Sequence, residues 1–282
     1  MEKTFLLGMG AQKSGTTWLH RILTARQYAN FGFTKEYHVL DAIYVPECEM
    51  FRSRFEKAAR IAIRDGYDTY STGSSKYDVT RMSFVTNDQA YFAYFADILT
   101  RRRVKLTGDI TPTYCSLPRD RLRYVESEFA KRDIVTRPLF LMREPVERLR
   151  SLVKMKFRKK EISPSKAEEL SAIRKMCGSE YDVVRANYEQ AILNMDEIFG
   201  DNCYIGFYET LFSEDTLRSI CDFLRIDYQP VDFDKRFNAS PSSNDLTEDE
   251  LAEIRPTYAR QYDFVRDRYG ADFISKIWGP GA

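Results

Sequence analysis

Short apolar runs recur along the chain and alternate with longer stretches that have helical spacing. The first run, residues 4–9 (TFLLGM), ends at Gly10 and is typical of a strand buried on both faces of a parallel sheet. Residues 16–25 then place Leu19, Ile22 and Leu23 on one helix face. The remaining patterns predict strands at 104–107, 138–142 and 203–207, and helices at 88–99, 118–131, 145–158, 181–199, 213–225 and 247–269.

This alternation predicts an α/β fold with a central parallel sheet and helices on both faces. Two stretches, 66–88 and 229–245, lack a clear period and are predicted to be irregular loops. There is no shift in composition that would mark a boundary. We therefore expect a single domain over 1–282, with insertions.

Composition narrows the class of protein. The 282 residues include 43 Lys and Arg against 42 Asp and Glu, a net charge of +1, with 43% hydrophobic residues. These values exclude a disordered chain and argue against a general nucleic-acid coat or a polybasic membrane binder. No apolar run approaches the ~20 residues of a membrane span. The five cysteines form no C-x-x-C pair and no ligand cluster with His. We expect a soluble, cytoplasmic chain with reduced thiols and no metal.

The loop after the first strand holds the most informative chemistry. Small residues allow backbone N–H groups to approach an anion, and the following helix adds the positive end of its dipole. The order matches neither G-x-x-x-x-G-K-[ST] nor G-x-G-x-x-G, which disfavours an ordinary nucleotide triphosphatase or a dinucleotide dehydrogenase. An ordinary strand–helix turn is the alternative. The residues suited to a phosphate or sulfate are Lys13, Ser14, Gly15, Thr16 and Thr17, and Trp18 follows them.

The order K-S-G-T-T-W resembles the 5′-phosphosulfate loop of the sulfotransferases, which use 3′-phosphoadenosine 5′-phosphosulfate (PAPS) as donor. The resemblance implies a P-loop-like fold in which Lys13 stabilises charge on the leaving nucleotide. It also implies that residues 14–17 hold the 5′-phosphate and that Trp18 lies against the adenine.

A second motif follows the strand predicted at 138–142. Residues 143–151 (REPVERLRS) resemble the family pattern R-[DE]-P-x-x-R-x-x-S, which implies that Arg143 and Ser151 hold the 3′-phosphate of the donor. The alternatives are a surface ion pair between Arg143 and Glu147 and a solvated Ser151. Tyr208, before Glu209, resembles a family tyrosine near the adenine.

A third segment, residues 34–41 (TKEYHVLD), resembles the K-E-x-H-x-x-D segment of carbohydrate sulfotransferases related to the heparan-sulfate enzymes. The resemblance implies that Glu36 is the base that takes the acceptor's proton and that His38 orients either Glu36 or the substrate. Lys35 and Asp41 would lie on the acceptor side. A charged loop with a structural histidine is the alternative, and we assign the other histidine, His20, to structure.

The chain departs from that carbohydrate group at one position. The group carries E-K-[ST]-P-x-Y, whereas residues 108–114 read GDITPTY and place Ile110 where the lysine would be. We do not transfer the role of that lysine to Ile110, and expect Lys13, Lys35 or another residue to supply the charge.

Together the motifs predict a PAPS-dependent sulfotransferase that acts on a hydroxyl or amine, with a carbohydrate or glycolipid as the implied acceptor. A P-loop-type kinase and a catalytically silent nucleotide-binding protein of the same fold remain alternatives. The cations of the predicted helix 145–158 and the residues after it are expected to be a solvated face, or else a rim for an anionic acceptor. They are Arg148, Arg150, Lys154, Lys156, Arg158, Lys159 and Lys160.

Overall fold

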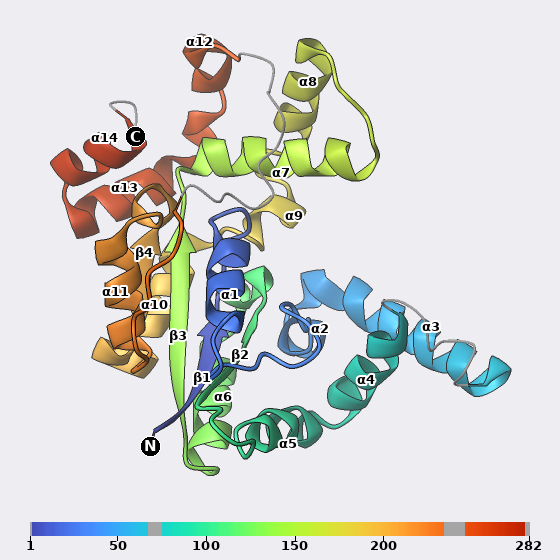
Figure 1. Cartoon of the computed structure of the whole chain (residues 1–282). Coiled ribbons are helices and arrows are strands. Elements are labelled where there is room, and N and C mark those ends of the chain that lie inside the picture. Colours follow the sequence, from blue (N-terminus) through green and yellow to red (C-terminus); the bar gives the residue numbers. More distant parts are fainter. Residues whose placement is uncertain (1, 67–74, 234–245, 280–282) are drawn as a thin grey trace.

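Four parallel strands form the centre of the structure (Figure 1), a computed structural model that describes residues 2–66, 75–233 and 246–279. The strands are β1 (Lys3–Gly8), β2 (Leu106–Ile110), β3 (Ile134–Met142) and β4 (Tyr204–Phe207), in the order β2-β1-β3-β4. Because all neighbouring pairs are parallel, the segments that follow the four strands meet at one edge of the sheet.

Helices cover both faces of the sheet, because its central strands are buried on both sides. Leu6 of β1 packs with Trp18 on the face that carries α1 (Thr16–Thr24) and α11 (Glu214–Phe223). Phe5 points the other way and stacks on Phe129 of α6 (Arg119–Ala130), with ring centroids 4.0 Å apart. This arrangement confirms the predicted α/β class.

The remaining helices extend this core. In Figure 1, α3 and α4 project together from the side of the molecule, and they pack on each other. The helices not yet given bounds are α2 (Leu40–Tyr44), α3 (Glu49–Asp65), α4 (Ser75–Thr86), α5 (Asp88–Ile98), α7 (Pro145–Lys159), α8 (Lys166–Met176), α9 (Glu180–Val183), α10 (Tyr188–Phe199), α12 (Glu248–Ala252), α13 (Ala259–Tyr269) and α14 (Ala271–Trp278), with short 3-10 turns η1 (Pro46–Cys48), η3 (Pro112–Ser116), η4 (Gly200–Asn202), η5 (Tyr208–Thr210) and η6 (Arg255–Tyr258).

Several predicted boundaries were wrong for identifiable reasons. The strand expected at 104–107 begins at Leu106, because the N–H of Val104 closes a turn onto Arg101. The helix expected at 181–199 is divided into α9 and α10, and the break leaves the carbonyl of Arg185 free to accept from Gln12 N (3.2 Å). The helix expected at 247–269 is interrupted at η6, where Pro256 lacks an N–H donor.

Other helices were missed. Residues 75–86, expected to be irregular, form α4, and α3, α8 and α14 were not predicted. α3 buries only Phe55 and two alanines, Ala58 and Ala62. The apolar residues of α4 are spread around the helix, so α4 has no clear apolar stripe. The irregular stretch predicted at 229–245 lies mostly outside the described residues.

A buried ion pair ties the C-terminal half together. Arg148, the second arginine of the 143–151 motif, is fully buried and pairs with the fully buried carboxylate of Asp182. Asp182 also accepts from the Tyr258 hydroxyl at 2.5 Å and from Gly178 N at 3.2 Å. Arg148 therefore joins α7 to α9 and η6.

We predict that Asp182→Ala lowers the free energy of unfolding by about 3–5 kcal/mol, because it leaves the Arg148 guanidinium buried without its counter-charge. The control is Asp263→Ala, which breaks an exposed pair with Arg266 and should cost about 1 kcal/mol or less. Urea unfolding of both variants measures the difference. Equal costs would contradict a structural role for this pair.

Candidate active site

The loop after β1 forms a tight cradle at the carboxyl edge of the sheet. Its chain continues to pair with β3, since Ala11 N donates to Leu141 O at 2.8 Å. Gly15 begins α1 with a φ of +85°, and a Cβ there would lie 2.4 Å from Leu211 Cδ2. Gly10, with a φ of +97°, is equally confined, since a Cβ would lie 2.6 Å from Pro112 O. Only glycine fits either position.

The cradle presents donors that have no partner of their own. Ser14 is fully buried, and its hydroxyl makes no hydrogen bond to the described residues. The first N–H groups of α1 have no intrahelical acceptors, and the helix dipole adds positive charge at the same place. An oxyanion would satisfy both, so the loop fits the phosphate or sulfate for which its sequence is suited.

Positive charge gathers around Lys13. Burial, together with the nearby charges of Arg158, Arg143, Lys35 and Lys159, lowers the pKa of its ammonium to about 8. Like charges that approach one another in this way repel, and a bound anion would relieve the repulsion. The predicted residues Lys13, Arg143 and Lys35 are therefore brought together by the fold.

Arg143 follows β3 and reaches back to this loop. Its guanidinium donates to Lys13 O at 3.3 Å and lies 4.3 Å from the ring centroid of Tyr208. Its backbone is held by the hydroxyl of Tyr188, which donates to Arg143 O at 2.7 Å. The ion pair to Glu147 that we considered as an alternative is also present, at 3.6 Å. Arg143 thus contacts the Lys13 loop and Glu147 at the same time.

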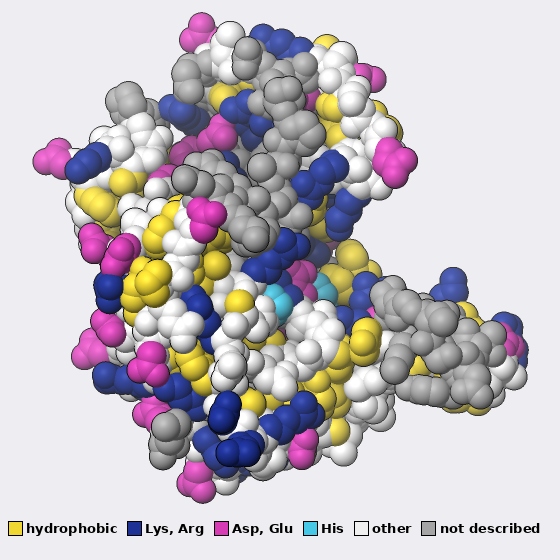
Figure 2. All heavy atoms as spheres, in the orientation of Figure 1, with side chains coloured by type: hydrophobic (Ala, Val, Ile, Leu, Met, Phe, Trp, Pro, Cys, Tyr) yellow, Lys and Arg dark blue, Asp and Glu magenta, His cyan; other side chains and the backbone are white. Residues whose placement is uncertain are grey.

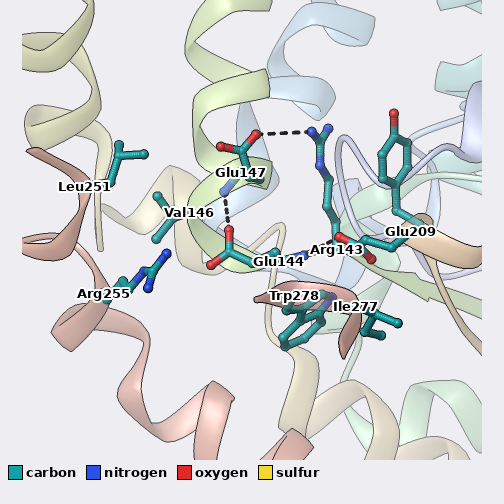
Figure 3. A pocket seen from close by; sticks show the side chains of 10 residues that line it. Arg143, Glu144, Val146, Glu147, Glu209, Leu251, Arg255, Ile277 and Trp278 are labelled. Atoms are coloured by element: carbon teal, nitrogen blue, oxygen red, sulfur yellow. Dashed lines mark hydrogen bonds and ion pairs between the residues drawn. The ribbon is translucent and has the colours of Figure 1, made fainter. Parts of the chain in front are cut away.

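A small pocket opens beside Arg143 (Figure 3). It has a volume of about 230 Å³ and lies between the start of α7, η5 and the C-terminal helices. Glu144 caps α7 by accepting from Glu147 N at 2.6 Å, and its own N–H donates to Glu209 Oε1 at 3.0 Å. Burial raises the pKa of both Glu144 and Glu209. Both residues stand in the quoted motifs, but the sequence gave no sign that Glu209 accepts from the backbone of Glu144.

Glu36 lies beside the loop, in an irregular segment that we call the Glu36 segment (residues 35–39). Lys35 Nζ lies 2.6 Å from Glu36 Oε1 and 3.1 Å from Thr16 Oγ1. Lys35 therefore joins the Glu36 carboxylate directly to the first turn of α1. The Glu36 side chain is 38% exposed, so an acceptor can reach it.

His38 lies between two carboxylates. Its Nδ1 is 2.7 Å from Asp41 Oδ2, and its Nε2 is 3.5 Å from Glu36 Oε2. Burial alone would lower the pKa of His38, but Asp41 and Glu36 outweigh it and raise that pKa to about 9. Burial would likewise raise the pKa of Glu36, but Lys35 and His38 hold it well below its ordinary value. At neutral pH, a protonated His38 therefore lies between the side chains of Glu36 and Asp41.

The other predicted residues take less direct positions. Trp18 is 3% exposed and packs edge-on against Phe212 at 5.1 Å. Ser151 is half-buried two turns along α7, and its hydroxyl makes no hydrogen bond within the described part of the chain. For both, binding of the donor stays a prediction. His20 has its pKa lowered to about 4 by burial and lies against Phe31, which supports a structural role.

Sequence reasoning missed residues that reach the Glu36 segment from distant elements. Phe51 of α3 stacks on the His38 ring at 3.7 Å, and Arg81 of α4 donates to Glu36 O at 3.2 Å. Asp109 accepts from Tyr37 N at 3.2 Å. Neither helix had been predicted, so no signal in the sequence placed Phe51 or Arg81 here.

The face of the molecule around these residues is hollowed. Figure 2 shows histidine side chains at the floor of a notch between α7 and the projecting α3 and α4, with Lys and Arg side chains along its rim. Within residues 2–66, 75–233 and 246–279, no helix has the length and apolar character needed to cross a bilayer, and no group of three His, Cys, Asp or Glu could hold a metal. All five cysteines are free thiols.

Comparison with solved structures finds this architecture in a sulfotransferase from Alicyclobacillus acidocaldarius. The two share a TM-score of 0.58 and 15% identity over 95% of this chain and 96% of that one. The chain has the sulfotransferase fold. No protein-family model matches the sequence, and no curated protein matches it.

Two further sulfotransferase structures overlap less closely. A sulfotransferase domain from the curacin biosynthetic pathway has a TM-score of 0.45 and 15% identity over 81% of this chain and 75% of that one. The corresponding domain of the Synechococcus PCC 7002 olefin synthase has a TM-score of 0.44 and 13% identity, over 92% and 94%. On the sulfotransferase fold of this chain, the loop, Arg143 and the Glu36 segment share one edge of the sheet.

The two histidines should titrate far apart. We predict a pKa near 9 for His38 and near 4 for His20, measured by NMR of the imidazole carbons and nitrogens across pH. Asp41→Asn should lower the pKa of His38, because it removes the closer carboxylate, and should leave His20 unchanged. If His38 titrates near 6.5 in the unaltered protein, the contacts that define this site are not formed in solution.

Proposed function

We propose that the chain is a PAPS-dependent sulfotransferase that transfers a sulfuryl group to a hydroxyl or amine of an acceptor. The observation that carries the proposal is the bridge made by Lys35. Its ammonium contacts Thr16 at the anion cradle and Glu36 at the exposed carboxylate, so an anion site and a base share one cation. The sulfotransferase fold supports the same conclusion.

The residues present fit the donor at two places. Ser14, Gly15, Thr16 and Thr17 would hold its 5′-phosphosulfate end, where the buried Ser14 hydroxyl lacks a partner among the described residues. At the other place, Arg143 and Ser151 would hold its 3′-phosphate. Trp18 and Tyr208 would lie near the adenine. The bound donor supplies the activated sulfuryl group.

The chain's own residues would manage a proton and a developing charge. As the acceptor's oxygen or nitrogen bonds to sulfur, its proton passes to Glu36, and the bond from sulfur to the bridging oxygen of the phosphosulfate breaks. The electron pair of that bond stays on the phosphate oxygen, where Lys13 stabilises it. The low pKa of Glu36 suits a late proton transfer, once the new bond has made the acceptor acidic. His38, held by Asp41, would keep Glu36 in place.

Lys35 would take the place of the lysine that carbohydrate sulfotransferases have where this chain has Ile110. Ile110 is buried, and its backbone N–H donates to Lys35 O at 2.9 Å. This hydrogen bond holds Lys35 at the site. Lys35 and Asp41 thus belong to the acceptor side of the proposal. We further propose that the acceptor is a carbohydrate or glycolipid, that the protein is cytoplasmic, and that residues 1–282 form a single domain.

We predict that Glu36→Gln lowers kcat by about 100-fold or more while the Kd for adenosine 3′,5′-bisphosphate stays unchanged, because the amide cannot accept the proton. Turnover is measured with radiolabelled PAPS against a panel of sugars, glycolipids and phenols, and binding by calorimetry.

The matched control for that variant is Glu56→Gln, on α3, whose carboxylate pairs with Arg52 at the surface. It should leave both constants unchanged. Full turnover by Glu36→Gln would show that another group is the base. Transfer from ATP in place of PAPS would favour the kinase, and binding without any turnover would favour the silent nucleotide-binding protein.

Removing the side chain of Arg143 should weaken nucleotide binding. We predict that Arg143→Ala raises the Kd for adenosine 3′,5′-bisphosphate by about 10- to 100-fold, the value of a charge-assisted hydrogen bond. Arg260→Ala, which removes an arginine 86% exposed on α13, is the control and should bind normally. An unaltered affinity in Arg143→Ala would refute the proposed 3′-phosphate contact.

A further inference from the structure

The Glu36 segment cannot hold its own shape. Residues 36–38 belong to no helix or strand, so their backbone N–H groups need partners elsewhere. His38 has a φ of +55°, in the left-handed region that costs free energy for a residue with a Cβ. Contacts from outside the segment must therefore fix its conformation.

One oxygen of Asp109, at the end of β2, reaches two consecutive amides of the segment. Asp109 Oδ1 accepts directly from Tyr37 N at 3.2 Å. It also accepts from the hydroxyl of Thr111 at 2.7 Å, and the same Thr111 oxygen accepts from His38 N at 3.4 Å. The carboxylate thus holds the residue after Glu36 directly and His38 through one hydroxyl.

The other oxygen anchors Asp109 in the core. Asp109 Oδ2 accepts from the hydroxyl of Tyr91 on α5 at 3.0 Å and from that of Tyr114 at 2.5 Å. Tyr114 in turn accepts from Leu40 N at 3.4 Å, where the segment enters α2. Every partner of Asp109 named here is a donor, which an ionised carboxylate requires. Burial raises its pKa to about 6 even so, and it is ionised above that pH.

We propose that Asp109 is a positioning residue that fixes the backbone of Tyr37 and His38 so that Glu36 and His38 face the site. The effect that we expect Asp109 to have on turnover rests on the proposed function. Asp109 is fully buried, and its hydrogen-bonding partners are neutral, so its carboxylate destabilises the core relative to an apolar side chain of similar volume. Its contacts with the Glu36 segment explain why a carboxylate stands at this position.

The test compares Asp109→Asn with Thr107→Val. Thr107 lies two residues earlier on β2 and is fully buried, and its hydroxyl has no hydrogen-bond partner among the described residues. Removing that hydroxyl should therefore change nothing at the site. The first readout is the pKa of His38, which is faced by Glu36 and Asp41 and, from α3, by the Phe51 ring.

In Asp109→Asn, we expect the pKa of His38 to fall from about 9 toward 6.5, because the histidine moves away from both carboxylates. We expect kcat to fall by about 100-fold, the effect of misplacing a catalytic group by about 1 Å. The Kd for adenosine 3′,5′-bisphosphate should stay unchanged, because Lys13 and Arg143 lie on other elements. Thr107→Val should match the unaltered protein in all three measurements.

Unchanged values of both the His38 pKa and kcat in Asp109→Asn would overturn the proposal. If Asp109→Asn does not fold, Thr111→Val tests the same link, since it keeps the carboxylate and removes only the hydroxyl between it and His38 N. A His38 pKa that stays at about 9 in Thr111→Val would then overturn the proposal. The histidine titration needs no turnover, so it decides the role of Asp109 even if the chain transfers nothing from PAPS.

Discussion

The parallel pairing of β1 with β2 and β3 is the constraint on which the candidate site depends. It brings the ends of these strands to one edge, so that the loop at Lys13, the segment after Asp109 and the side chain of Arg143 meet there. Helix α1 adds its N-terminal donors because Gly15, with its positive φ, allows the loop to turn into the helix. The site is thus made from segments far apart in the sequence.

The charges at this edge are arranged in two groups of opposite sign. Lys13, Arg143 and Lys35 form the positive group, and burial and the neighbouring cations together lower the pKa of Lys13. Glu36 and Asp41, with a protonated His38 between them, form the negative group. Lys35 belongs to both. Cations beside an exposed carboxylate are consistent with the group transfer that we propose.

The sequence allowed prediction of those parts of the site whose chemistry is local. The loop at Lys13, Arg143 at a strand end and the Glu36 segment were each recognisable from consecutive residues, and the alternation of strands and helices was enough for the fold class. The projecting pair α3 and α4 was missed. The apolar residues of α4 form no clear stripe, and α3 buries only three side chains. Phe51 and Arg81 were missed as site residues because they lie on these two helices. Asp109 could not be recognised because its partners, Tyr37 and Tyr91, approach it only in the folded chain. Arg148, by contrast, lies within a recognised motif, and its buried pairing with Asp182 gives it a structural role.

The most direct test of the account is calorimetric titration with two isomers, adenosine 3′,5′-bisphosphate and adenosine 5′-diphosphate. They have the same composition and differ only in the position of one phosphate. If Lys13 and Arg143 contact different phosphates, the protein should bind adenosine 3′,5′-bisphosphate about tenfold or more tightly than adenosine 5′-diphosphate. The 3′-phosphate gains one further charge-assisted contact. Equal affinity, or tighter binding of the 5′-diphosphate, would contradict a PAPS site and would favour a P-loop kinase.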